Sequence, residues 1–87
     1  MTLPQQVQAF HERAHNYFGH NPQSKSAESV MAHHITAFIS TTELNLTTVQ
    51  TGKLLGLHHS TIIHARDKVR HNLKHYQKYI DKIKEMT

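Results

Sequence analysis

The chain of 87 residues contains no cysteine and no tryptophan, and it has only three glycines and two prolines. Without cysteine it forms neither a disulfide nor a thiolate zinc site, which fits a reducing, cytoplasmic setting. No apolar run approaches the roughly 18 residues of a membrane span. A basic start followed by an apolar core, the mark of a secretion signal, is also missing. We therefore expect one small cytoplasmic domain over residues 1–87 with a single hydrophobic core.

Strand-like alternation and internal repeats are absent as well, and apolar residues instead recur every three or four positions. This periodicity predicts a first helix that starts near Leu3 and ends before the Gly-His-Asn-Pro stretch at 19–22. A second helix, with Ser26 as its N-cap, is expected to end where the chain loosens at 40–42. The buried positions expected in these helices are Leu3, Val7, Phe10, Ala14, Tyr17 or Phe18, and then Met31, Ile35, Phe38 and Ile39.

The second half of the chain predicts two or three more helices. Asn45 or Thr47 can cap a helix that runs up to Gly56, which supplies a turn. The next helix starts near His59, and because neither Gly nor Pro follows, residues 59–86 form either one long helix or two. The apolar stripe expected there comprises Ile62, Ala65, Val69, Leu73, Tyr76, Ile80 and Ile83, with Leu57 filling the gap before it. The sequence therefore predicts an all-α bundle of four to five helices.

The stretch Thr47–Val69, TTVQTGKLLGLHHSTIIHARDKV, is typical of a helix-turn-helix. It predicts a helix, a tight turn at Gly56, and a second helix whose first turn is rich in hydrogen-bonding groups. In DNA-binding proteins of this kind the second helix enters the major groove, and its N-terminal residues touch base edges. The stretch thus predicts sequence-specific binding of double-stranded DNA.

The net charge of +4 is confined to the C-terminal quarter of the chain. Basic and acidic residues balance over 1–65, whereas 66–87 carry seven basic residues against three acidic ones. A basic face beside a reading helix is the expected footprint for phosphate contact. The alternative is a solvated, Lys-rich helix. Ten scattered histidines would add positive charge on acidification, so affinity for DNA is expected to rise as pH falls.

The segments Gly52–Gly56 (GKLLG) and His59–Ala65 (HSTIIHA), followed by Lys68 and Val69, are similar to the signature I-G-x-x-F-G-G-R-D-H-T/S-T-V-x-H-A. That signature belongs to the C-terminal DNA-binding domain (domain IV) of the bacterial chromosomal replication initiator DnaA. Further similarity to that family lies at 32–39, and weaker similarity at 17–19 and 24–26. The resemblance covers most of the chain. It implies a helix-turn-helix fold like that of DnaA domain IV or the Trp repressor, with a role in replication initiation or transcription control.

The chain departs from that family at several positions. The turn after Gly56 is one residue shorter, and Leu57 and His58 stand where the family has Arg and a base-reading Asp. His33 replaces an Arg, and Met31 stands near a position where some members place an Arg in the minor groove. The resemblance thus implies the family's fold and mode of DNA binding with a different recognition sequence. The chain has no Gly-rich phosphate loop and no room for an ATPase domain.

Base contacts are expected from the start of the second helix of the motif. Ser60 and Thr61 offer hydroxyl groups, and the methyl group of Thr61 can meet a thymine methyl group. Ser60 can alternatively serve as the N-cap. His59 matches a base-contacting His of the family, and its ring nitrogen can donate to guanine or thymine. His58 completes the set of predicted base-contacting residues.

Phosphate contacts are expected from the cations and histidines around that helix. Lys53 lies where the first helix of such motifs touches the DNA backbone. His64 follows Ser60 by one helical turn, so it either points to the groove or bonds inward. The predicted phosphate-contacting residues are Lys53, His64, Arg66, Lys68, Arg70, His71 and, mainly on the resemblance, His33 and Lys25.

A second hypothesis is a protein-interaction or homodimerisation module in which the helix-turn-helix is only a scaffold. The residues that would dock the partner lie on the last helix and are Tyr76, Tyr79, Ile80 and Ile83.

A third hypothesis, a zinc hydrolase, comes from the segment His11–His15 (HERAH), which fits the pattern H-E-x-x-H. A chain this rich in histidine produces the pattern by chance, and a third ligand and a substrate groove are not evident. His71 and His75 also share one helix face, but no thiol or carboxylate completes a site. We therefore expect no enzyme activity, no metal, no cofactor and no membrane association.

Overall fold

Every element that the structure describes is a helix. The computed structural model describes residues 2–18 and 27–86, including the backbone but not the side chains of residues 27–29. The helices are α1 (Leu3–Phe18), α2 (Ala27–Thr42), α3 (Thr48–Leu55), α4 (His59–His71) and α5 (Leu73–Glu85). The predicted all-α fold is therefore confirmed. None of these helices combines the length and apolar character needed to cross a membrane.

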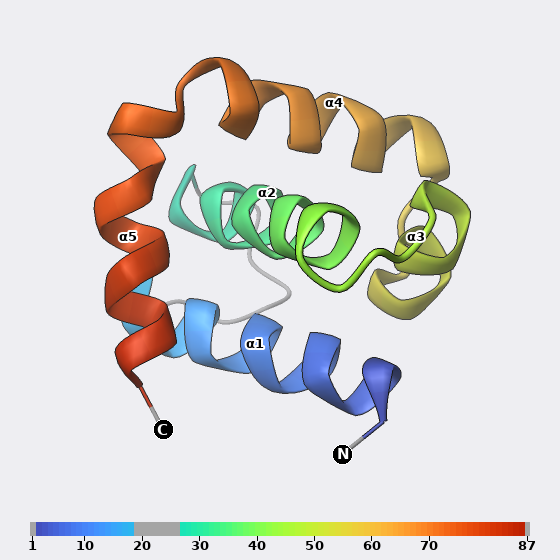
Figure 1. Cartoon of the computed structure of the whole chain (residues 1–87), viewed down its shortest axis with the longest axis horizontal. Helices are drawn as coiled ribbons and strands as arrows, with labels where there is room; N and C mark the ends of the chain where they lie inside the picture. The colour runs from blue at the N-terminus through green and yellow to red at the C-terminus, as the bar shows by residue number, and fades with distance from the viewer. Residues whose placement is uncertain (1, 19–26, 87) are drawn as a thin grey trace.

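Helix α2 forms the centre of the molecule, with α4 packed on one side and α1 on the other (Figure 1). Helix α3 closes one end of this sandwich and contacts α2, α4 and α1, while α5 closes the other end and contacts α1 and α4. The central position of α2 follows from its composition, because it buries both apolar and small polar side chains. Over residues 30–42, its buried residues are Ala32, Ile35, Thr36, Ala37, Ile39 and Ser40.

Most buried apolar side chains of the described residues form two clusters. The larger joins α1, α2, α4 and α5 and contains Phe10, Ala14, Ala32, Ile35, Ile39, Val69, Tyr76, Ile80 and Ile83. The smaller lies between α2 and α4 and contains Ala37, Ile62 and Ala65. Leu57 packs against the smaller cluster from the turn before α4, as the sequence predicts. The turn is therefore anchored to the core as well as to its two helices.

The predicted loosening of the chain at 40–42 is wrong, because α2 continues to Thr42. Each hydroxyl in this segment bonds to the carbonyl oxygen four residues earlier. Ser40 Oγ donates to Thr36 O at 2.7 Å, and Thr42 Oγ1 donates to Phe38 O at 2.6 Å. These bonds satisfy the polar groups inside the helix, so the run of β-branched and hydroxyl residues does not end it.

The question of one or two helices over 59–86 is settled by a break at Asn72. The side-chain Nδ2 of Asn72 donates to Lys68 O at 2.9 Å, and its backbone nitrogen donates to Val69 O at 3.2 Å. The chain then turns so that α5 lies across the ends of α1 and α4 (Figure 1). Leu73, at this corner, is 39% exposed, so the prediction that it belongs to the buried stripe is wrong.

Candidate nucleic-acid interface

The N-terminus of helix α3 is held by side-chain hydrogen bonds. The side chain of Thr47 accepts a hydrogen bond from Gln50 N at 3.0 Å, and Gln50 Oε1 accepts one from Thr47 N at 2.9 Å. This reciprocal arrangement is a capping box, which satisfies two backbone donors at once. Of the two caps that the sequence offers, Thr47 and not Asn45 is used.

The turn between α3 and α4 depends on two glycines. Gly56 has φ = 70° and ψ = 31°, a left-handed conformation that costs glycine little. Gly52 O accepts hydrogen bonds from the backbone of both Gly56 and Leu57. The Leu57 carbonyl approaches so closely that a Cβ at residue 52 would lie 2.5 Å from its oxygen. The start of α4 is thus held at a defined angle to α3.

The first turn of α4 is capped by a histidine. His58 Nδ1 accepts a hydrogen bond from Ser60 N at 3.1 Å, so the alternative that Ser60 is the N-cap is wrong. An Nδ1 acceptor requires the proton of the neutral ring to sit on Nε2. The Nε2–H group is then a donor at the exposed edge of the ring. The ring of His59 lies beside that of His58, with the centroids 4.2 Å apart.

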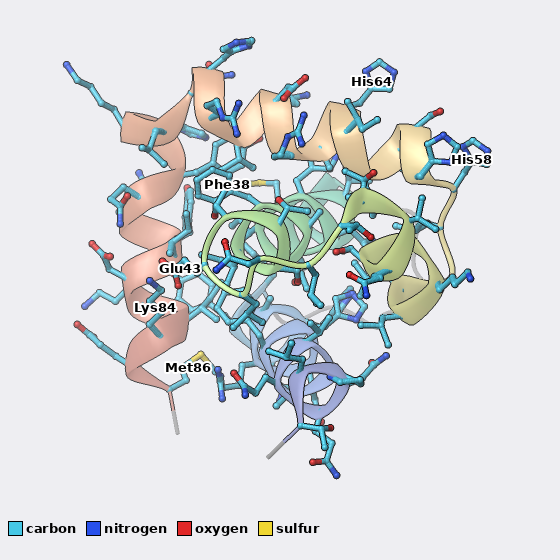
Figure 2. All side chains as sticks on the ribbon, turned by 45° about the vertical axis from the view of Figure 1, so that its right-hand side comes forward. Phe38, Glu43, His58, His64, Lys84 and Met86 are labelled. Atoms are coloured by element: carbon cyan, nitrogen blue, oxygen red, sulfur yellow. The ribbon has the colours of Figure 1, made fainter. Side chains whose placement is uncertain are left out.

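All four predicted base-contacting residues, His58, His59, Ser60 and Thr61, are exposed. The opposite face of α4 is buried through Ile62, Ala65 and Val69, as the sequence predicts. Figure 2 shows His58 at the start of α4 and His64 farther along, both pointing away from the body of the molecule. His64 is exposed, so of its two predicted orientations the outward one is found.

Three of the predicted phosphate-contacting cations are exposed and carry no ion pair with any carboxylate in the described part of the chain: Lys53, Lys68 and Arg70. Lys53 lines a shallow hollow together with His58 and His59. Lys68 and Arg70 lie on different sides of α4, because each residue rotates the helix face by about 100°. Lys68 therefore shares an edge of α4 with Thr61, whereas Arg70 lies across the helix from both.

Arg66 is less available for contact with a phosphate than the sequence suggests. Its side chain is 27% exposed, and its Nε donates to Asp67 Oδ1 at 3.2 Å. The carboxylate of Asp67 is 42% exposed and lies one turn after His64, next to the polar face of α4. The sequence analysis missed this acidic group as a site residue, although the spacing of Ser60, His64 and Asp67 places all three on one helix face.

One further predicted residue, His33, does not join this surface. His33 lies on the side of α2 that faces α1, where its ring is 4.7 Å from that of His11 and 5.2 Å from that of His15. Burial, followed by the charges of His15 and His33, lowers the pKa of His11 to about 4. Lys25 lies outside the described residues.

His34, the neighbour of His33, is a residue that the sequence analysis did not single out. Burial lowers its pKa, with smaller contributions from the positive charges of Lys68 and His33. A histidine within a largely apolar helix was the available signal for this partly buried residue.

Comparisons of the chain with models of protein families, with curated proteins and with solved structures found no match.

Proposed function

We propose that this chain binds double-stranded DNA and reads its sequence through the first two turns of α4, as a helix-turn-helix protein similar to DnaA domain IV. The observation that carries the proposal is the exposed polar surface formed by His58–Thr61 and His64, backed by a buried face that fixes its orientation. With 13 residues, α4 is about 20 Å long. The major groove is about 12 Å wide and admits one α-helix.

The chemistry of this surface suits base edges. Hydroxyl groups of Ser60 and Thr61 both donate and accept, and the Nε2–H of His58 donates toward N7 or O6 of guanine. The side chains are short, and the caps at Thr47 and His58 limit the movement of the helices that carry them. A short, rigid set of groups discriminates between bases better than long flexible chains, because less conformational entropy is lost on binding.

The positive charges flank this surface rather than occupy its centre. Lys53 lies beside the turn and Lys68 lies farther along α4, on exposed positions that suit the two phosphate backbones bordering a groove. Two lysines of α5 are paired with carboxylates and contribute less: Lys82 with Glu85, and Lys84 with Glu43. Figure 2 shows Lys84 beside Glu43. A role in origin recognition or transcription control follows from the resemblance to the initiator.

Most of the residues that would dock a partner on α5 are buried inside the protein itself. Tyr76, Ile80 and Ile83 are at most 5% exposed and form part of the chain's own core. Only Tyr79 of the four predicted docking residues is partly exposed, and it packs against the same core. We therefore favour DNA as the partner.

A titration of fluorescent duplexes tests the proposal. The protein should bind at about 150 mM salt, and its affinity should fall as the salt concentration rises. The slope of log affinity against log salt reflects the number of phosphates contacted. His59→Ala should reduce the affinity for a preferred sequence, whereas His75→Ala, an exposed histidine on α5, serves as the matched control. Equal losses in both variants, or no binding by the parent protein, would reject α4 as the reading helix.

A further inference from the structure

Three imidazole rings meet where α1 crosses α2. His11 and His15 lie one turn apart on α1, and His33 approaches them from α2. One ligand nitrogen from each ring can be chosen so that all three atoms lie within 4.8 Å of one another. This cluster lies on the side of α2 opposite α4, so the proposed DNA-binding surface does not use it.

The cluster is sheltered from water. The side chain of His15 is 1% exposed, and those of His11 and His33 are partly buried. His11 Nε2 and His15 Nε2 are 2.9 Å apart, so in the metal-free protein one of these nitrogens donates a hydrogen bond to the other. Helix crossings are usually filled by apolar side chains, because burying polar groups costs free energy unless they are hydrogen-bonded. Three imidazole rings at one crossing are therefore unusual.

The distances and the donor atoms fit a metal ion. Zinc binds histidine nitrogen at about 2.0–2.1 Å with tetrahedral geometry, which places neighbouring ligand nitrogens about 3.4 Å apart. His11 Nε2 and His15 Nε2 are 2.9 Å apart, and one nitrogen from each of the three rings can be chosen so that no two lie more than 4.8 Å apart, so the observed distances are close to this value. Small rotations of the rings would therefore suffice.

We propose that His11, His15 and His33 bind one divalent transition-metal ion of the zinc type, which fastens α1 to α2. Neutral imidazole is a ligand that Zn²⁺, Co²⁺ and Ni²⁺ accept well. Coordination through both Nε2 atoms requires the donating ring to take its other neutral tautomer, with the proton on Nδ1. With three protein ligands, the fourth position is open to a water molecule.

This site departs from the sequence expectation of no metal, which rested on the lack of a third ligand for His11 and His15. The fold supplies that ligand from α2. Glu12, the acidic residue of the H-E-x-x-H pattern, is exposed and lines a different surface with Gln8 and Leu54. Because that carboxylate lies away from the cluster, we assign the ion a structural role and no hydrolytic one.

Titration of the metal-free protein with Zn²⁺ in competition with a chromogenic chelator tests the proposal. We expect one ion per chain and a higher melting temperature, because an ion that binds only the folded state stabilises it. His33→Gln should weaken the affinity for Zn²⁺ by more than about tenfold. Loss of a residue that only hydrogen-bonds to a ligand already costs about tenfold or more, and His33 would be a ligand itself. His71→Gln, which removes an exposed histidine at the end of α4, outside the cluster, is the matched control and should bind Zn²⁺ with unchanged affinity.

A second measurement does not depend on the folding of any variant. Added to the unmodified protein, Co²⁺ should broaden the ring signals of His11, His15 and His33 in NMR spectra and leave those of His71 and His75 sharp. The proposal is overturned if no ion is taken up, if His71→Gln loses affinity while His33→Gln keeps it, or if the broadened signals belong to His71 and His75.

Discussion

The carbonyl oxygen of Leu57 lies 2.5 Å from the point where a Cβ of residue 52 would stand, so only glycine fits at Gly52 without a shift of the backbone. Gly52→Ala should therefore push α4 away from α3 and lower the free energy of unfolding by about 1–3 kcal/mol, the usual range for overpacking. Urea unfolding measures this loss. Gly56→Ala is the comparison, because its Cβ meets no atom and the left-handed conformation alone should cost about 1–2 kcal/mol. An unchanged free energy of unfolding in Gly52→Ala would contradict the close approach of the Leu57 carbonyl to residue 52.

Ser60→Ala should reduce discrimination between the preferred DNA sequence and a mismatched one by about 1–3 kcal/mol, because a hydroxyl group at a base edge is lost. Its backbone nitrogen remains capped by His58, so the stability of α4 should hardly change. Competition binding with the two duplexes measures the effect. A loss that is equal on both sequences would mean that Ser60 does not read a base.

Lys68→Ala should weaken binding to all duplexes to a similar extent. Lys68 is exposed, and its ammonium group has no carboxylate partner among the described residues, so it can neutralise a phosphate. Losing one such contact should flatten the slope of log affinity against log salt by about 0.9. Lys82→Ala, which removes a lysine paired with Glu85 on α5, is the control and should leave the slope unchanged. If Lys68→Ala and Lys82→Ala show the same salt slope, Lys68 does not contact a phosphate.

Asp67→Asn should strengthen binding to duplex DNA several-fold. The carboxylate of Asp67 lies beside the polar face of α4 and holds Arg66 in an ion pair. Removing its charge lowers repulsion of the phosphates and releases the guanidinium group for them. Asp81→Asn on α5 provides the control, since both changes alter the net charge equally. Weaker binding by Asp67→Asn would indicate instead that the carboxylate accepts from a cytosine amino group.

The metal-free protein should lose stability as the pH falls from 6.5 toward 4. The pKa of His11 in the folded state is about 4, below its ordinary value of 6.5. Over this interval the unfolded chain binds the proton and the folded chain does not, so acid favours unfolding, and the contribution is complete above pH 6.5. Urea midpoints across this range with a chelator present, compared with those of His11→Gln, measure it. An identical pH dependence in the variant would contradict this origin.

Much of the fold follows from the sequence because its signals are local. The three-and-four spacing of Val7, Phe10 and Ala14 identifies α1, and Gly56 identifies the turn before α4. The break at Asn72 was not predictable, because asparagine is tolerated inside helices and the corner arises only when α5 packs across α1 and α4. The continuation of α2 past Ser40 depends likewise on hydrogen bonds that the composition alone does not reveal.

The exposed positions of the candidate interface were predictable for a similar reason. Once Ile62, Ala65 and Val69 mark the buried face of α4, Ser60 and His64 must lie on the other. The histidine cluster was not predictable, because His33 meets His11 only through the packing of two helices that are joined by residues 19–26. Contacts between distant segments are the part of a site that a periodic pattern leaves undetermined.

Selection of binders from a pool of random duplexes at about 150 mM salt tests the central claim most directly. We predict enrichment of one short motif by the parent protein, and loss of that motif when His59 and Ser60 are both replaced by alanine. Retention of no DNA, or retention of duplexes without any common motif, would contradict the claim that α4 reads a DNA sequence.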